Sequence, residues 1–346
     1  MSAASLIWLQ FAACAVLIGV AGFQLSRYGD VISQRTGLSG SWIGLALLAT
    51  VTSLPELATG ITSVTLAQAP NVAVGNALGS CVLNLVFLVV IDFIFREEPV
   101  WHRASQGHVL AAAFGVVLLG FTLVSLLMSH LTAAGPSGAA AATAPLGIGL
   151  ATPVVLALYF VAMRTVFSYE RAHVVPSTVG DALAKPLLTL RVACIRFAMA
   201  AAVVVGAGLW LPFVAVRLAT AMGWNGSFVG SLFVAIVTTL PELAVTLSAL
   251  RLGALDMAIR NLLGSNLFNV TIIAVDDLFY RPGPLLAHVS PVHAVTAGSA
   301  IIMTGLAMVG LFFRPGSRVL RAVGWVSLGL AAMYLLNTYV LFLHGE

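Results

Sequence analysis

Charged residues are scarce in this sequence. Lysine, arginine, aspartate and glutamate together make up 8% of the chain, whereas hydrophobic residues make up 60%. A soluble domain carries about 25% charged residues and could not hide this much apolar surface from water. The composition therefore excludes an ordinary soluble domain and predicts a polytopic membrane protein. The net charge of +4 does not indicate nucleic-acid binding, because the basic residues lie in short loops between apolar runs, where they orient a protein in the bilayer.

Cysteines and catalytic motifs are also scarce. The three cysteines, Cys14, Cys81 and Cys194, lie in apolar runs without metal-ligand spacing, and we expect them to be buried free thiols. There is no glycine-rich phosphate loop, and no serine–histidine or paired-aspartate arrangement recurs at helical spacing. We therefore expect no enzymatic activity and no cofactor. The first apolar run lacks a preceding basic segment, so it is predicted to be a retained helix and not a signal peptide.

Apolar runs predict the membrane spans. A helix needs about 20 residues to cross about 30 Å of hydrocarbon. Breaking the chain at proline, glycine and charged clusters gives ten runs, at about 5–25, 38–66, 72–94, 107–128, 147–163, 194–215, 227–250, 257–279, 290–312 and 319–343. Of the 16 basic residues, Arg217 and Arg281 fall on one side, Arg260 within a span and the rest on the opposite side. This bias predicts a multi-pass cell-membrane protein with both termini on the non-cytoplasmic side.

One polar motif occurs twice in this apolar sequence. Residues 52–56 read Thr-Ser-Leu-Pro-Glu, and residues 238–242 read Thr-Thr-Leu-Pro-Glu. About two dozen residues later each copy is followed by a second polar cluster, Asn76, Ser80 and Asn84 in the first half and Asn261, Ser265 and Asn269 in the second. A shift of 186 residues places Glu56 over Glu242, and a shift of 185 places one cluster over the other. Similarity of this kind indicates a duplicated unit.

The duplication predicts the fold. With five spans per unit, the second copy crosses the membrane in the opposite orientation, which is the inverted-repeat arrangement of many secondary transporters. We therefore predict an all-α integral membrane protein of about ten transmembrane helices in two inverted five-helix repeats. The first repeat comprises residues 1–163 with its motif at 52–84, and the second comprises residues 194–346 with its motif at 238–269. A polar cytoplasmic linker at 164–193 is predicted to join them.

The repeated residues are oxygen donors suited to a hard cation. A carboxylate inside a membrane helix costs about 2.5 kcal/mol or more, so Glu56 and Glu242 indicate a functional site. Pro55 and Pro241 each free a carbonyl in the preceding turn. Calcium takes six to eight such oxygen ligands. The asparagines and serines of the second clusters are spaced by four and form a polar stripe on each helix, and bonding between helices explains them equally well.

These motifs resemble the two alpha-repeats of the cation/calcium antiporter superfamily, in particular the sodium/calcium exchangers. The resemblance implies that Glu56 and Glu242 bind calcium with the carbonyls of Thr52 and Thr238. It also implies sodium binding by the remaining hydroxyls and amides of the motifs, namely Ser53, Ser80, Thr239, Ser265, Asn84 and Asn269. Asn76 and Asn261 are possible accessory residues. Asparagine at positions 84 and 269 argues against potassium co-transport.

Two positions depart from the family pattern. Val51 and Val237 stand where relatives usually have glycine, and Arg260 stands opposite Gly75 of the first half. Arg260 either snorkels or pairs with Asp256 one turn earlier, or it points at Glu242 and acts as a tethered cation. Further from the motifs, Asp92 and Asp277 lie at predicted helix ends and are expected to pair with Arg96 and Arg281. The seven histidines show no shared spacing.

The leading functional prediction is an antiporter that exchanges Ca²⁺ for Na⁺ by alternating access. Two facing carboxylates repel each other, and one divalent or several monovalent cations would neutralise them, which makes exchange obligatory. Protons would compete for the same carboxylates. The alternatives are a proton-driven exchanger of calcium or another divalent cation, or a glutamate-lined cation channel. The hydroxyls favour sodium, because protons need no such ligands. The predicted partners are inorganic cations and the lipid bilayer, with no nucleic acid and no obligatory protein partner.

Overall fold

The chain folds almost entirely into helices. The computed structural model describes residues 2–36, 50–94, 100–133, 147–173, 188–316, 318–319 and 323–344. The helices of the first half are α1 (Ala3–Thr36), α3 (Leu54–Thr65), α4 (Pro70–Ile94), α5 (Val100–Arg103), α6 (His108–Ala133) and α7 (Ala151–His173). Those of the second half are α9 (Leu190–Met222), α10 (Gly226–Phe228), η2 (Val229–Val234), α11 (Ala235–Thr238), α12 (Leu240–Arg251), α13 (Leu255–Phe279), η3 (Leu285–Ala287), α14 (His293–Phe313) and α15 (Trp325–His344). The short strands β1 (Arg318–Val319) and β2 (Val323–Gly324) pair antiparallel.

The helices correspond closely to the predicted spans. Within the described residues, eight helices are long and apolar enough to cross a membrane, or nine when the bent pair Gly226–Thr238 and Leu240–Arg251 counts as one span. Several boundaries differ: α1 continues to Thr36, α7 continues to His173, and α9 spans Leu190–Met222, while part of the predicted span 38–66 lies outside the described residues. The start and end of the predicted linker 164–193 are therefore helical. Polar residues can extend a membrane helix past the apolar core, so a count of apolar residues ends too early.

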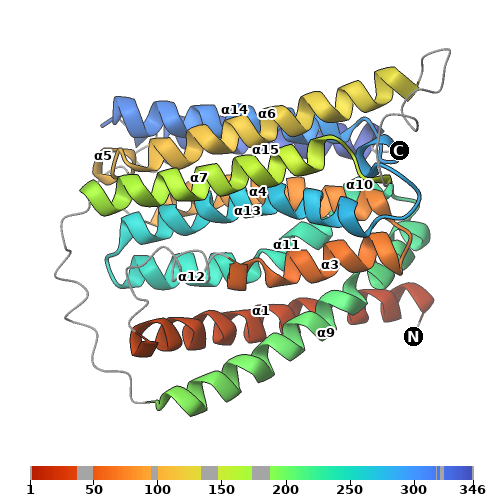
Figure 1. Cartoon of the computed structure of the whole chain (residues 1–346), viewed down its shortest axis with the longest axis horizontal. Helices are drawn as coiled ribbons and strands as arrows, with labels where there is room; N and C mark the ends of the chain where they lie inside the picture. The colour runs from red at the N-terminus through yellow and green to blue at the C-terminus, as the bar shows by residue number, and fades with distance from the viewer. Residues whose placement is uncertain are drawn as a thin grey trace.

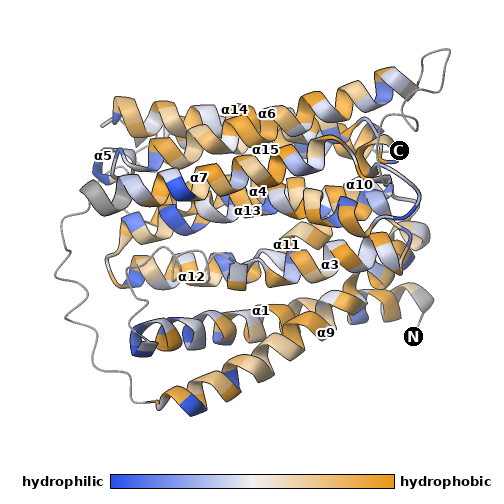
Figure 2. Cartoon of the chain, in the orientation of Figure 1, coloured by the Kyte–Doolittle hydropathy of each residue, from blue (hydrophilic) through white to orange (hydrophobic). Residues whose placement is uncertain are grey.

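The helices form layers around a central pair. α4 and α13 lie in the middle and run in opposite directions, α1 and α9 pack together on one side, and α14 packs along α6 on the other (Figure 1). Both termini lie at the same end of the molecule (Figure 1). The central helices are the most buried of the candidate spans, whereas the outer helices carry exposed apolar side chains such as Leu9 and Phe312. Figure 2 shows that hydrophobic residues predominate along the helices, as expected for a protein in contact with lipid.

Each half contains one broken helix. A turn at Ser53 precedes α3, and a turn at Thr239 separates α11 from α12, which bends the chain by 44°. In both halves the proline of the motif occupies the second position of the new helix, where its missing N–H costs nothing. From these breaks α3 runs toward the end that holds the termini and α12 runs away from it (Figure 1).

Close approach of the two halves depends on two glycines of α4. A Cβ on Gly79 would overlap the backbone of Ser231 in the π-helical turn η2, and a Cβ on Gly75 would lie 3.0 Å from the Ser231 nitrogen. The small residues therefore let the backbones of α4 and η2 touch. This contact brings the second motif against the helix that follows the first.

Candidate ion-binding site

The two glutamates meet at the centre of the molecule. Glu56 lies in the first turn of α3 and Glu242 in the first turn of α12, and both side chains are completely buried. They are close enough to interact electrostatically. A helix N-terminus carries partial positive charge, which favours a carboxylate in its first turn. Each break in a helix thus both positions one glutamate and offsets part of its charge.

Residues of each motif interact with the glutamate of the other. The Ser53 hydroxyl donates to Glu242 Oε1 over 2.9 Å, and Thr52 also interacts with Glu242. Reciprocally, Thr238 interacts with Glu56, and its hydroxyl donates to Asn76 Oδ1 over 2.9 Å. The site is therefore built jointly by both halves, and neither motif forms it alone.

Many of the side-chain oxygen atoms in this site accept no hydrogen bond from the described residues. Among the described residues, the buried acceptors without a donor include Glu56 Oε1 and Oε2, Glu242 Oε2, Asn84 Oδ1 and Asn269 Oδ1, and the hydroxyls of Ser80 and Ser265 have no partner either. Leaving buried polar groups unpaired costs about 1–3 kcal/mol each, and more for charged groups. Carboxylate, amide and hydroxyl oxygens are the ligands of hard cations, so the donor set fits such an ion.

Other predicted site residues make hydrogen bonds within their own helix or between neighbouring segments. The Thr239 hydroxyl donates to Ala235 O of its own helix over 2.7 Å. Asn261 Nδ2 lies 3.3 Å from Glu242 O, so it supports the backbone of the second motif. Asn84 Nδ2 donates to Asn266 Oδ1 over 3.0 Å and links α4 to α13. The asparagines thus serve helix packing while leaving some oxygens available, and Asn266 is a partner that the sequence analysis missed.

Arg260 interacts with a nearby acid. It lies one turn after Asp256 on α13 and interacts with that carboxylate electrostatically. The Asp256 carboxylate also accepts hydrogen bonds from Ser105 N at 2.8 Å and bonds His108 Nε2 at 2.9 Å. This is the environment that the pairing interpretation of Arg260 expects. The tethered-cation interpretation stays a prediction.

A matching contact occurs at the other end of the molecule. There Asn71 Oδ1 accepts from Ser290 N over 2.7 Å and lies 3.2 Å from His293 Nε2. A shift of 185 residues relates Asn71 to Asp256, and the same shift relates Ser105 and His108 to Ser290 and His293. The prediction that the histidines share no spacing was therefore wrong for this pair. Applying the repeat shift to the histidines would have revealed it.

Asp92 and Asp277 have partners other than those predicted. Asp92 accepts from Val100 N at 3.3 Å, Gly324 N at 2.8 Å and Ser327 Oγ at 2.7 Å. Asp277 accepts in the same order from Leu285 N at 2.6 Å, Gly149 N at 2.8 Å and Thr152 Oγ1 at 2.5 Å.

The expectation that Asp277 pairs with Arg281 is replaced by this finding, whereas Arg96, the partner expected for Asp92, lies outside the described residues. Charge-assisted bonds to backbone N–H groups satisfy a buried carboxylate as fully as an arginine does. Each aspartate therefore fixes the start of the last helix of the opposite half, α15 for Asp92 and α7 for Asp277.

The cysteine prediction is correct for two residues of three. Cys14 and Cys81 are buried free thiols, and the Cys81 sulfur lies 3.7 Å from Asn266 O. Cys194 is free but exposed on α9, which contradicts the prediction. A position near the start of an outer helix is apolar because it contacts lipid, so hydropathy alone does not distinguish it from a core position.

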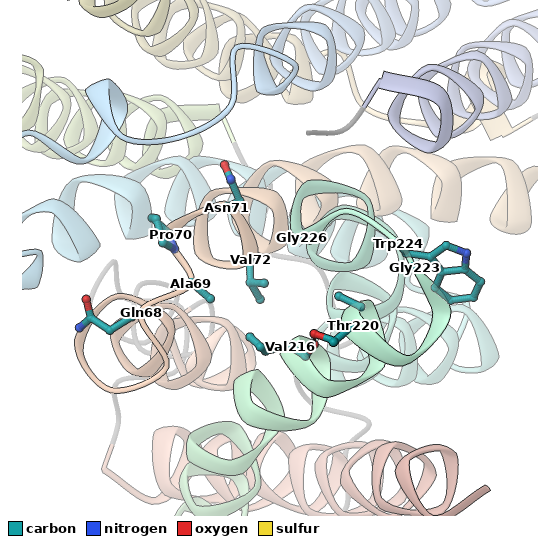
Figure 3. Close-up of a pocket in the computed structure, with 11 residues that line it drawn as sticks. Gln68, Ala69, Pro70, Asn71, Val72, Val216, Thr220, Gly223, Trp224 and Gly226 are labelled. Carbon is teal, nitrogen blue, oxygen red and sulfur yellow. Dashed lines mark hydrogen bonds between the residues drawn. The ribbon is translucent and has the colours of Figure 1, made fainter. Parts of the chain in front are cut away.

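Figure 3 shows a pocket of about 380 Å³. It is bounded by the turn between α3 and α4 and the turn between α9 and α10, and Asn71, Thr220 and Trp224 line it. Neither glutamate contributes to its walls. The pocket is thus a feature of the end that holds the termini, next to the Asn71–His293 contact.

Comparison with known proteins identifies the family. The family described as sodium/calcium exchanger protein matches residues 6–169 and 192–342, which is most of the chain. The chain therefore belongs to this family, within the cation/calcium antiporter superfamily. It is also similar to the putative antiporter CaxA of Alkalimonas amylolytica, with 27% identity over 73% of this chain and 74% of CaxA.

Two solved structures share the fold. The H⁺/Ca²⁺ exchanger CAX has a TM-score of 0.70 at 16% identity, covering 97% of this chain and 81% of CAX. The sodium–calcium exchanger NCX_Mj has a TM-score of 0.58 at 21% identity, covering 99% of each chain. The protein is thus a multi-pass membrane protein of a cation-exchanger family, with the fold of these transporters.

Proposed function

We propose that this protein is a secondary antiporter that exchanges Ca²⁺ for Na⁺ across the membrane by alternating access. One observation carries the proposal: the two motifs meet, with Ser53 bonded to Glu242 while both oxygens of Glu56 lack a donor among the described residues. Two buried carboxylates that interact with each other repel. Moving them across the membrane is costly when no cation neutralises their charge. A divalent cation or several sodium ions would neutralise the centre, so the protein would change orientation only when loaded.

The site residues then take separate roles. Glu56 and Glu242 would bind calcium together with the carbonyls of Thr52 and Thr238, which lie at the two helix breaks. The hydroxyls and amides around them would bind sodium, namely Ser53, Ser80, Thr239, Ser265, Asn84 and Asn269. The bonds of Asn76 and Asn261 to the motifs support accessory roles, since they hold Thr238 and the backbone of Glu242.

We further propose that the fold consists of two inverted five-helix repeats. The opposite directions of α3 and α12, and of α4 and α13, support this (Figure 1). Further support comes from the pairs of equivalent bonds around Asp92 and Asp277. Such repeats place a site at their interface near the membrane midplane. The distribution of arginine supports an orientation with both termini on the non-cytoplasmic side.

Proton coupling is the second candidate. The fold is shared with an H⁺/Ca²⁺ exchanger as well as with a sodium–calcium exchanger. The number of buried hydroxyls around the glutamates favours sodium, because a proton binds one carboxylate oxygen and needs no further ligand. A cation channel is disfavoured, since two proline-broken helices that carry a repeated motif are typical of secondary transporters. Calcium flux without countertransport would be its signature.

The proposal is tested by calcium-45 uptake into sodium-loaded proteoliposomes with pH equal and buffered on both sides. We expect uptake by the wild type, and none by Glu56→Gln or Glu242→Gln. Asp30→Asn is the matched control, because Asp30 is an exposed carboxylate on α1 that bonds Gln34. Uptake that needs a pH gradient and not sodium would favour the proton-driven exchanger. Full activity in either glutamine variant would overturn the central assignment.

A further inference from the structure

A third completely buried carboxylate lies outside the glutamate pair. Asp276 on α13 is 0% exposed, and neither of its oxygens has a hydrogen-bond donor among the described residues. The adjacent Asp277 differs, because three donors hold its carboxylate. An ionised carboxylate without donors is expensive inside a membrane protein, and such a residue marks a functional site by default.

Asp276 faces the helix that carries Glu56. A Cβ placed on Gly60 of α3 would lie 2.5, 2.7 and 2.9 Å from Oδ2, Oδ1 and Cγ of Asp276. The absent side chain of Gly60 therefore makes the space that this carboxyl group fills. Gly60 follows Glu56 by one turn, which is about 6 Å along the helix axis. Asp276 thus lies one turn from the central site, in the direction of the end that holds the termini (Figure 1).

The surroundings suit a proton better than a metal ion. Calcium needs six to eight oxygen ligands. On the α3 face that Asp276 touches, Ser63 is the next polar residue after Gly60; its hydroxyl is buried and has no partner among the described residues. One carboxyl group packed against a glycine, with one hydroxyl a turn further along, is far short of a metal site. A proton binds a single carboxylate oxygen and removes the charge.

The helices packed against α13 bring few ionisable groups near Asp276. α3 contributes Glu56, and α12 contributes Glu242 at the centre. α13 runs toward the termini, so ionisable groups at the opposite ends of its neighbours are distant (Figure 1). These are Asp92 on α4, His108 on α6, Arg164 on α7 and Arg251 on α12. Among the side chains that the structure describes, the remaining groups on these helices make no hydrogen bond to the Asp276 carboxylate, namely Cys81, His130, Tyr159 and Tyr169.

We propose that Asp276 is a proton-binding residue of the exchange cycle, separate from Glu56 and Glu242. Its carboxylate takes up one proton from water and returns it to water in the course of the cycle. The equivalent position in the first half is Ile91, since 276 minus 185 is 91, so only one half carries this group. The inference rests on the proposed exchange function and adds a protonation step to it.

Infrared spectroscopy of the reconstituted full-length protein tests the protonation directly. We expect a protonated carboxylic-acid absorption that persists in Glu56→Gln/Glu242→Gln and disappears when Asp276→Asn is added. Calcium-45 exchange measured over a pH series provides the second readout. We expect the pH dependence of Asp276→Asn to involve about one proton fewer than that of the wild type. Asp277→Asn is the matched control, and it should keep the wild-type pH profile even where it lowers activity.

Two results would overturn the inference. One is the absence of any acid absorption in Glu56→Gln/Glu242→Gln that Asp276→Asn removes, and the other is an unchanged pH profile in Asp276→Asn. If Asp276→Asn fails to fold, Gly60→Ala displaces the carboxyl group without removing it and should shift the profile. Gly298→Ala, whose Cβ meets nothing within 4 Å, should not. Failure of calcium exchange in the wild type would instead count against the proposed function and would leave the infrared measurement valid.

Discussion

The two halves of this protein agree at the centre and differ around it. Both present a broken helix, a proline and a buried glutamate, and both anchor an aspartate at the end of the following helix. Away from the centre, Arg260 replaces the equivalent of Gly75, Asp256 replaces Asn71, and Asp276 replaces Ile91. All three replacements add an ionisable group to the second half. The ion site therefore requires the same residues from both halves. The contacts outside it can differ between the halves, so the two ends of the molecule carry different ionisable side chains.

The largest effect is expected from removing one of the two equivalent glutamates of the ion site. Replacing either Glu56 or Glu242 by Gln should abolish calcium exchange, with a loss of at least about 100-fold, because a neutral amide cannot offset a divalent cation in a buried site. Folding should persist, since the glutamine amide has nearly the same shape and keeps an oxygen that can accept the hydrogen bond from Ser53. Exchange assays and thermal melts of the same samples would separate the two outcomes. Unequal losses in the two variants would show that the halves are not equivalent.

The repeated glycines offer a sharper comparison of packing. Gly79 and Gly264 are equivalent, but a Cβ on Gly79 would overlap Ser231, whereas a Cβ on Gly264 meets nothing within 4 Å. We expect Gly79→Ala to destabilise the fold by about 1–3 kcal/mol through overpacking. Gly264→Ala should be neutral or slightly stabilising, because alanine is the better helix former. Thermal unfolding in detergent would measure both. Equal destabilisation would contradict the packing of α4 against η2.

The equivalent contacts of Asp256 and Asn71 predict a smaller effect. Asp256 accepts from Ser105 N and bonds His108, but its side chain is half exposed, so the contact is worth at most about 1 kcal/mol. Asp256→Asn keeps an oxygen that can accept from Ser105 N, and it should lower the melting temperature only slightly. Asn71→Ala removes the acceptor of Ser290 N and should lower it more. Thermal unfolding of both variants would measure the difference, and equal shifts would contradict it.

The smallest effect is expected at Arg260. If it pairs with Asp256, Arg260→Gly should leave the charge moved per calcium unchanged and cost little stability. If it is a tethered cation directed at Glu242, the same substitution should increase the number of sodium ions exchanged and change the charge moved. Current recordings from proteoliposomes on a solid support would distinguish these outcomes. Unchanged electrogenicity would eliminate the tethered-cation interpretation.

Much of this architecture was predictable from the sequence, for physical reasons. Apolar runs must match the bilayer thickness, so most spans followed from hydropathy, and the glutamates stood out because charge inside a membrane is expensive. The partners of Asp92 and Asp277 were not predictable. Two of the three donors to each aspartate come from the opposite half of the chain, and Arg281, the partner expected for Asp277, is not among them. The exposure of Cys194 was missed because lipid and core are both apolar.

The sequence by itself determined that this chain is an integral membrane protein and that one polar motif occurs in both halves. Composition and repetition are properties of the chain that no folding alters. Only the tertiary structure decided which motif contacts which glutamate, that Ser53 reaches across to Glu242, and that Asp276 fills the space left by Gly60. Those contacts join residues far apart in the chain, and they depend on the crossing of packed helices, which hydropathy and spacing do not specify.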